Sequence, residues 1–382
     1  RTAGYRARYT LPNHQIFMRK LEKSGELDRK IEFLPTDAEI NERMQEDRGL
    51  TSPEMSVLLA YSKMSLDREI LKSTLVTDAD FNDLLIAYFP KHLQENYKDF
   101  ILNHYLRKEI IANQLANLVV NRAGMTFVSR FTDEFSSPLS DILKAWWVAY
   151  NLLGAPRLYN EIEGLDNKVD AEVQLKLYVG VEKAVERLCR WILRYVKDLS
   201  SASSIISKYT THVETLESHI DKLIKSEDYP EVRDEENLYI SANVPAVLAK
   251  LVSRLGYLPQ VMDIVLLAME NNLAYDVVAD NYFAAGRLLQ IDWLRKNVLL
   301  LSRGNKWQAL ARSALLADVF KLYRGAMQLA IVNTKADTRA WIADNQDRMD
   351  KINAILEELQ SYKVLDLAML SAAIREFAHI LE

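Results

Sequence analysis

The sequence predicts an all-α protein, folded as a multi-helix bundle or an irregular helical array with at least two packed subdomains. Eleven glycines and nine prolines in 382 residues are few, about 5% of the chain against a usual share of roughly 12%. Helices are therefore rarely interrupted. Repeated capping signatures and apolar residues spaced at a period near 3.6 point the same way. The chain is 49% hydrophobic, enough to bury a sizeable core.

The N-terminal residues, 1–50, are expected to form a connecting arm of short helical pieces. Gly25 and Pro35 are the stops between these pieces. Thr36 with Glu39 makes a capping box, in which the hydroxyl and the carboxylate satisfy free backbone amides at a helix start. A helix is therefore expected to begin within the arm at this point.

A helical subdomain is expected over 51–198. Thr51 and Glu54 repeat the capping box at its start, and the proline between them stands near the first turn, where its missing N–H does no harm. The helix that follows is expected to run to about Ser73. Further along, the Ser-Ser-Pro sequence ending at Pro138 divides two more helices.

Beyond this subdomain the pattern changes from apolar to acidic and back. The segment 199–237 is interpreted as a polar helical return followed by an acidic linker, in which acids gather around one proline between Ser226 and Asn237. A C-terminal helical subdomain is then expected over 238–382. No fixed-period repeat is found, although helices of similar length can still stack as an irregular array.

One helical segment carries amides where a plain core helix would not. Asn113, Asn117 and Asn121 recur every four residues, and because a helix advances about 100° per residue they form one narrow stripe. Two interpretations fit: a water-facing helix edge, and a hydrogen-bonded seam where another helix or domain docks. The candidate docking seam comprises Arg107, Glu109, Asn113, Gln114, Asn117, Asn121 and Arg122.

Catalytic motifs are not found in the sequence. A dinucleotide-binding turn needs closely spaced glycines so that the backbone can approach a pyrophosphate, yet the closest pair, Gly154 and Gly164, lies ten residues apart. No phosphate-cradling loop and no Ser/His/Asp or Cys/His order can be justified. We therefore predict no catalytic, cofactor-binding or metal site in this chain.

Composition excludes several kinds of partner. The net charge of −5 provides no broad basic field, so nucleic acid is not expected. No eighteen apolar residues run together, so no membrane segment is expected. The single cysteine, Cys189, lies among apolar neighbours and is interpreted as a small buried hydrophobe in a reducing cytoplasm.

Several long motifs carry a resemblance to a known family. They are the amide-bearing segment HYLRKEIIANQLANLVVNRAGMTFVSR from His104, LTSPEMSVLLAYSK from Leu50, the Tyr88-Phe89-Pro90 turn, EIEGLDNKVDAEVQ from Glu161 and GNKWQALARSAL from Gly304. Together they closely resemble the C-terminal helical region of the large bacterial NAD-dependent glutamate dehydrogenases, over essentially the whole chain. The resemblance implies that a dehydrogenase domain lies upstream in a far longer polypeptide.

On that resemblance the chain is expected to be a noncatalytic scaffold, assembly or regulatory region. The implied parent uses NAD to convert glutamate to 2-oxoglutarate and ammonium, whereas no cofactor is expected in this fragment. Expected partners are the upstream dehydrogenase domain of the same polypeptide and further copies of the parent in a homo-oligomer. An independent helical protein-binding adaptor is the alternative, and a helical-bundle enzyme is a third possibility.

Overall fold

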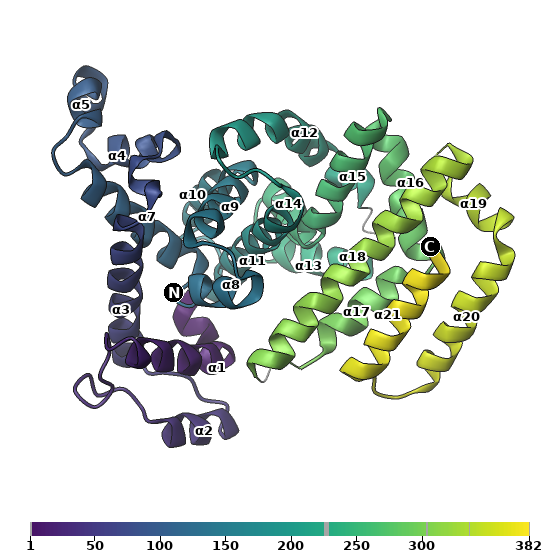
Figure 1. The fold of residues 1–382 in the computed structure, drawn as a ribbon, viewed down its shortest axis with the longest axis horizontal. Coiled ribbons are helices and arrows are strands. Elements are labelled where there is room, and N and C mark those ends of the chain that lie inside the picture. Colours follow the sequence, from purple (N-terminus) through teal and green to yellow (C-terminus); the bar gives the residue numbers. More distant parts are fainter. Residues whose placement is uncertain (1, 225–228, 303–304, 336, 382) are drawn as a thin grey trace. The chain divides into compact units, whose positions relative to one another are not determined.

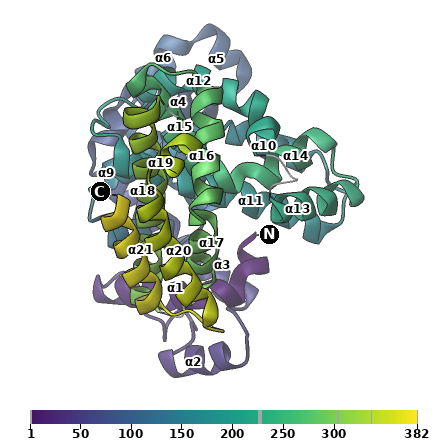
Figure 2. The same ribbon diagram turned by 90° about the vertical axis from the view of Figure 1, so that its right-hand side faces the viewer.

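A computed structural model describes residues 2–224, 229–302, 305–335 and 337–381, with side chains placed for all of these except 2–9, 215–223 and Lys306. Every regular element in these ranges is a helix, and they contain no strand. The all-α prediction is therefore confirmed. The chain divides into two compact units, Arg1–Glu214 with Tyr229–Gly256 (unit 1) and Thr215–Asp228 with Tyr257–Glu382 (unit 2) (Figures 1 and 2).

Unit 1 is built around two helix pairs, in which α3 packs against α7 and α9 packs against α11. Trp146 and Trp147 on α9 are both buried, so the apolar face of this helix is wide. The helices of unit 1 are α1 (Thr2–Lys23), α2 (Asp37–Gln45), α3 (Ser52–Leu71), α4 (Asn82–Tyr88), α5 (Lys91–Asn96), α6 (Lys98–Leu102), α7 (Arg107–Ala123), α8 (Phe127–Phe135), α9 (Leu139–Leu152), α10 (Ala155–Glu163), α11 (Ala171–Tyr195), α13 (Pro230–Ser241) and α14 (Ala246–Arg254), with the 3-10 turns η1 (Thr74–Thr77) and η2 (Ala79–Phe81).

Unit 2 is built around its longest helix, α18, which packs against α16, α17, α19 and α21. Two tyrosines fix one of these contacts: Tyr282 and Tyr323 stack with their ring centroids 5.1 Å apart. A Cβ at Gly286 would lie 2.4 Å from Cε1 of Tyr323, so only glycine fits there. Its helices are α15 (Leu258–Asn271), α16 (Tyr275–Leu288), α17 (Ile291–Leu300), α18 (Lys306–Thr334), α19 (Thr338–Asp344), α20 (Gln346–Ser361) and α21 (Leu367–Leu381).

Two elements contain a sequence boundary between the units. They are α12 (Ala202–Leu223) and the 3-10 turn η3 (Leu255–Tyr257). One described helical stretch, Ala246–Asn271, is long and apolar enough to cross a membrane, and 89% of its window is buried inside the structure. Because the core helix of a folded domain passes the same test, this stretch is weak evidence for a membrane span.

The N-terminal arm differs from its prediction. Short helical pieces are expected there, but α1 is continuous over 22 residues with Pro12 inside it. Leu11, Met18 and Leu21 are buried at spacings of seven and three residues, so one apolar side of the helix packs against the core over residues 11–21. Tertiary packing therefore outweighs the local helix-breaking tendency of the proline.

The acidic stretch between α12 and α13 also differs from its prediction as a linker. Residues 225–228 of this stretch lie outside the described residues, but α13 begins at Pro230 and has Glu231 in its first turn. Proline and acidic residues both favour a helix N-terminus, so the composition that suggested a linker marks a helix start instead. The four-part division at residues 50, 198 and 237 stays a prediction.

Candidate docking surfaces

The predicted docking seam lies on α7, whose two sides differ sharply. Ile111 and Leu115 on the apolar side are fully buried, and α3 and α4 pack against this helix. On the amide side, Asn113 and Asn121 are exposed and Asn117 is half-buried. The stripe predicted from the spacing therefore exists, and it faces solvent.

Within the stripe, neighbouring amides bond to one another. Asn117 Nδ2 donates to the carbonyl oxygen of Asn113 at 2.9 Å and to its Oδ1 at 3.1 Å. Amide pairs at this spacing support a helix by about 0.2–0.5 kcal/mol. Asn113 and Asn121 stay exposed, so no other described helix covers these two amides.

The two arginines of the seam have internal contacts instead. Arg107 Nη2 donates to Asn82 Oδ1 at 2.9 Å, which ties the start of α7 to α4. At the other end, the Arg122 guanidinium lies 4.2 Å from the centre of the Tyr159 ring and donates to Glu163 at 3.3 Å. Arg107 and Arg122 thus position α7. Glu109 and the amide side chains that lie between the two arginines face outward.

A polar pocket of about 370 Å³ opens at the C-terminal end of the seam. Two of its lining residues, Tyr159 and Tyr178, stack with their ring centroids 6.0 Å apart, and Tyr159 also stacks on Tyr150 at 6.3 Å. Burial raises the pKa of Tyr159, and Glu182 raises it further, so this phenol stays neutral. The lining residues are Asn121, Arg122, Tyr159, Glu163, Asp166, Tyr178 and Glu182.

Asn121 and Arg122 are the lining residues that belong to the predicted docking seam. Tyr178 and Glu182 come from α11, where the only local signal is their spacing of four residues on one helix face. Among the described residues, no group of three or more His, Cys, Asp or Glu is placed to hold a metal ion. The pocket can offer hydrogen bonds and carboxylate charge to a polar group.

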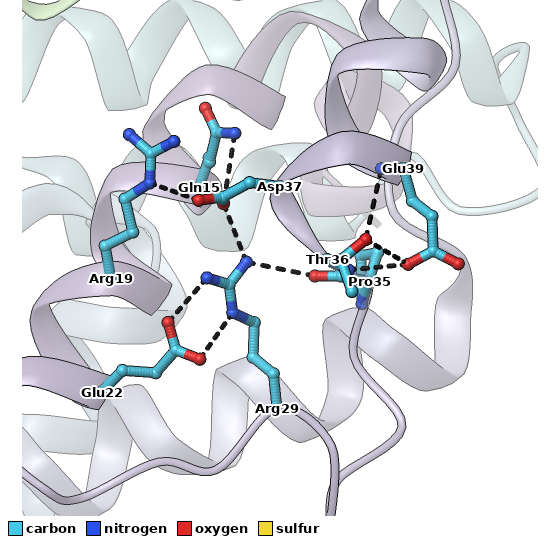
Figure 3. Close-up of polar contacts among 8 residues, drawn as sticks. All are labelled: Gln15, Arg19, Glu22, Arg29, Pro35, Thr36, Asp37 and Glu39. Carbon is cyan, nitrogen blue, oxygen red and sulfur yellow. Dashed lines mark hydrogen bonds and ion pairs between the residues drawn. The ribbon is translucent and has the colours of Figure 1, made fainter.

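Arg29 makes three of the hydrogen bonds that connect the parts of the N-terminal arm, as Figure 3 shows. Arg29 donates from Nε and Nη2 to the two carboxylate oxygens of Glu22, at 2.8 and 2.6 Å, and from Nη1 to Asp37 at 2.9 Å. Arg19 Nε donates to the other oxygen of Asp37 at 2.9 Å. We call these four residues the arm clamp; it fixes α1 to the start of α2.

Capping chemistry supports the same arm. Thr36 N donates to Glu39 Oε2 at 2.7 Å and Glu39 N donates back to Thr36 Oγ1 at 3.4 Å, which confirms the predicted capping box (Figure 3). The second box is also present, with Thr51 N donating to Glu54 at 2.7 Å. Arg43 on α2 binds the Glu54 carboxylate with two nitrogens, at 2.6 and 2.9 Å. This pair joins α2 to α3.

Comparison with known proteins identifies the family. The sequence model described as glutamate dehydrogenase, C-terminal, matches residues 47–379. The chain belongs to this glutamate dehydrogenase C-terminal family. The match takes in α7, the polar pocket and unit 2 up to residue 379, whereas the arm clamp lies before it.

Three relatives of this family member are similar over nearly the whole chain. An NAD-specific glutamate dehydrogenase of Pseudomonas aeruginosa is 31% identical over 98% of this chain, but over only 24% of its own length. Its counterpart in Halomonas elongata is 29% identical over 97% of this chain and 23% of its own length. The corresponding protein of Mycobacterium tuberculosis is 27% identical over 98% and 23%. The chain thus spans about a quarter of the length of the curated relatives that it matches.

Proposed function

We propose that this chain is the noncatalytic C-terminal helical region of a large NAD-dependent glutamate dehydrogenase, where it acts as a scaffold for assembly or regulation. The observation that carries the proposal is the extent of the match: 98% of this chain aligns with 24% of the Pseudomonas relative. About three quarters of such a relative is left to hold a dehydrogenase domain. The sequence of this chain has no closely spaced glycines for a dinucleotide-binding turn.

The reaction of the parent is the oxidation of glutamate by NAD, with water, to 2-oxoglutarate, ammonium and NADH. We assign NAD binding and hydride transfer to the upstream domain. The helical region packs against that domain and contributes to a cytoplasmic homo-oligomer. The exposed amides of α7 are the proposed contact, because Asn113 and Asn121 can bond to a partner surface without first breaking a contact with another helix.

The catalytic half of the proposal is tested on the isolated chain. We expect no heat of NAD binding in titration calorimetry and no glutamate-dependent NADH formation, because the chain offers no turn for a pyrophosphate at a helix N-terminus. The full-length protein, assayed under the same conditions, is the positive control. Saturable NAD binding with turnover by the isolated chain would contradict the proposal.

The docking half is tested with Asn113→Leu and Asn121→Leu. In the isolated chain each change is expected to alter the free energy of unfolding by less than about 0.5 kcal/mol, because both side chains face solvent. In the full-length protein a buried partner group would be stranded, so assembly and activity should fall. Asn353→Leu, at an exposed position on α20, is the matched control. If full-length variants behave like this control, the stripe is an ordinary wet helix edge.

A further inference from the structure

Large apolar side chains are concentrated on one exposed segment of unit 1. Residues 88–106, which we call the aromatic tip, run from the end of α4 through α5 and α6 to the start of α7, with α5 at the outer end (Figure 1). Tyr105 is 93% exposed and Phe100 is 77% exposed. Tyr88, Tyr97 and Leu106 are each about half exposed as well. Exposed apolar side chains gathered in one short segment in this way are typical of interaction sites.

The aromatic tip is ordered although little of it is buried. Gln94 Nε2 donates to the carbonyl oxygen of Phe89 at 2.6 Å, and the Phe89 and His104 rings meet edge to face at 5.3 Å. His104 Nδ1 also accepts from Leu106 N at 3.1 Å. Local contacts thus fix the backbone that presents the exposed rings. Preorganised aromatic side chains lose little entropy on binding and dominate interface energies.

The net charge of the aromatic tip indicates which class of partner it can bind. Lys91 and Lys98 are balanced by Glu95 and Asp99, so the segment carries no net charge from its acids and bases. Nucleic acids and anionic membranes are bound through a surplus of Lys and Arg. A neutral surface rich in Tyr and Phe is instead complementary to an apolar pocket on a protein.

We propose that the aromatic tip is an anchor that inserts into an apolar pocket on the part of the same polypeptide that lies outside this chain. The inference rests on the proposed function. Relatives have about three quarters of their length outside the matched region, so such a surface is tethered to the tip. Tethering gives an effective concentration on the order of millimolar, which is enough to keep a few exposed rings covered.

Photo-crosslinking in the full-length protein tests the anchor. A benzoylphenylalanine at position 105 or at position 100 is expected to crosslink to upstream residues of its own polypeptide, as shown by mass spectrometry of mixed light- and heavy-isotope copies. Crosslinks that join only light to heavy copies, tip-dependent binding to lipid vesicles, or no crosslink at all would each overturn the proposal. Position 364, where Val364 is 81% exposed in unit 2, serves as the control site.

Hydrogen exchange gives a second readout with matched variants. Amides of residues 88–106 are expected to exchange at least tenfold more slowly in the full-length protein than in the isolated chain. Phe100→Ser with Tyr105→Ser should remove that difference while the circular dichroism melting curve of the isolated chain stays unchanged, whereas Val364→Ser should leave the protection intact. Equal exchange rates in the wild-type full-length protein and the wild-type isolated chain would overturn the anchor but leave the proposed function standing. The proposed function fails separately, through NAD turnover by the isolated chain.

Discussion

At the scale of single residues, unit 1 depends on a cluster of two glutamates and three arginines between α8 and α11. Glu134 is only 11% exposed and accepts from Arg190 Nε at 3.0 Å and from Arg194 Nη2 at 3.2 Å. Glu186 pairs with Arg130 and with Arg190. Burial lowers the pKa of Arg190, but the two glutamates raise it by more. In the sequence, Arg190 and Arg194 are two basic residues spaced four apart, and the structure pairs both with Glu134 on α8.

Removing one charge from this cluster should destabilise the chain. Glu134→Gln leaves three arginines with one carboxylate, that of Glu186, and Arg194 loses its ion pair with Glu134. Breaking a buried pair costs about 3–5 kcal/mol, and partial exposure reduces our expectation to roughly 1–3 kcal/mol. Urea denaturation measures this loss in the free energy of unfolding. Glu161→Gln, which breaks an exposed pair with Arg157 on α10, should cost less than about 0.5 kcal/mol. Equal losses in the two variants would mean that burial of the cluster contributes nothing.

At the scale of elements, the arm clamp makes the attachment of α2 depend on pH. Burial raises the pKa of Asp37, but hydrogen bonds from Arg29 and Arg19 outweigh it, so the pKa lies below its usual value of 3.8. A lowered carboxyl pKa stabilises the folded arm above the unfolded pKa, and that contribution is lost as pH falls through the folded pKa. The arm should therefore loosen only in strong acid.

Hydrogen exchange of the backbone amides of residues 28–46 tests the direction of this pH dependence. Asp37→Asn should exchange faster than wild type above about pH 5, and the difference should vanish as the wild-type carboxyl becomes protonated in strong acid. Comparing the two proteins at the same pH removes the intrinsic pH dependence of exchange. Asp344→Asn, at an exposed position on α19, should match wild type throughout. A difference that grew toward low pH would contradict the clamp.

Sequence alone could predict those elements whose ends are set by local chemistry. Thr36 and Thr51 cap α2 and α3 as expected, and Pro138 separates α8 from α9, because caps and prolines act within one turn. The sequence does not predict a helix as long as α1, because a continuous helix through Pro12 depends on packing along its buried face. The pocket was missed for the same reason: Tyr178 joins it only when α11 packs on α10, and no local rule reports that.

At the scale of the whole molecule, the two compact units each contain their own core and their own buried polar cluster. In unit 2, Asp263 is 1% exposed and accepts from Tyr282 OH at 3.0 Å and from Arg324 Nη1 at 3.3 Å. The corresponding cluster of unit 1 surrounds Glu134. Domains with separate cores usually unfold as separate cooperative units, so each cluster should control the stability of its own unit.

Calorimetry of the isolated chain is therefore expected to show two transitions. Asp263→Ala leaves a buried tyrosine hydroxyl and an arginine without their shared acceptor, a loss of about 2–4 kcal/mol, and should lower the melting temperature of one transition. Glu134→Gln should lower the other, and the double variant should show both shifts added, because distant sites without shared partners behave independently. A single transition lowered by either change would show instead that the 382 residues unfold as one cooperative unit.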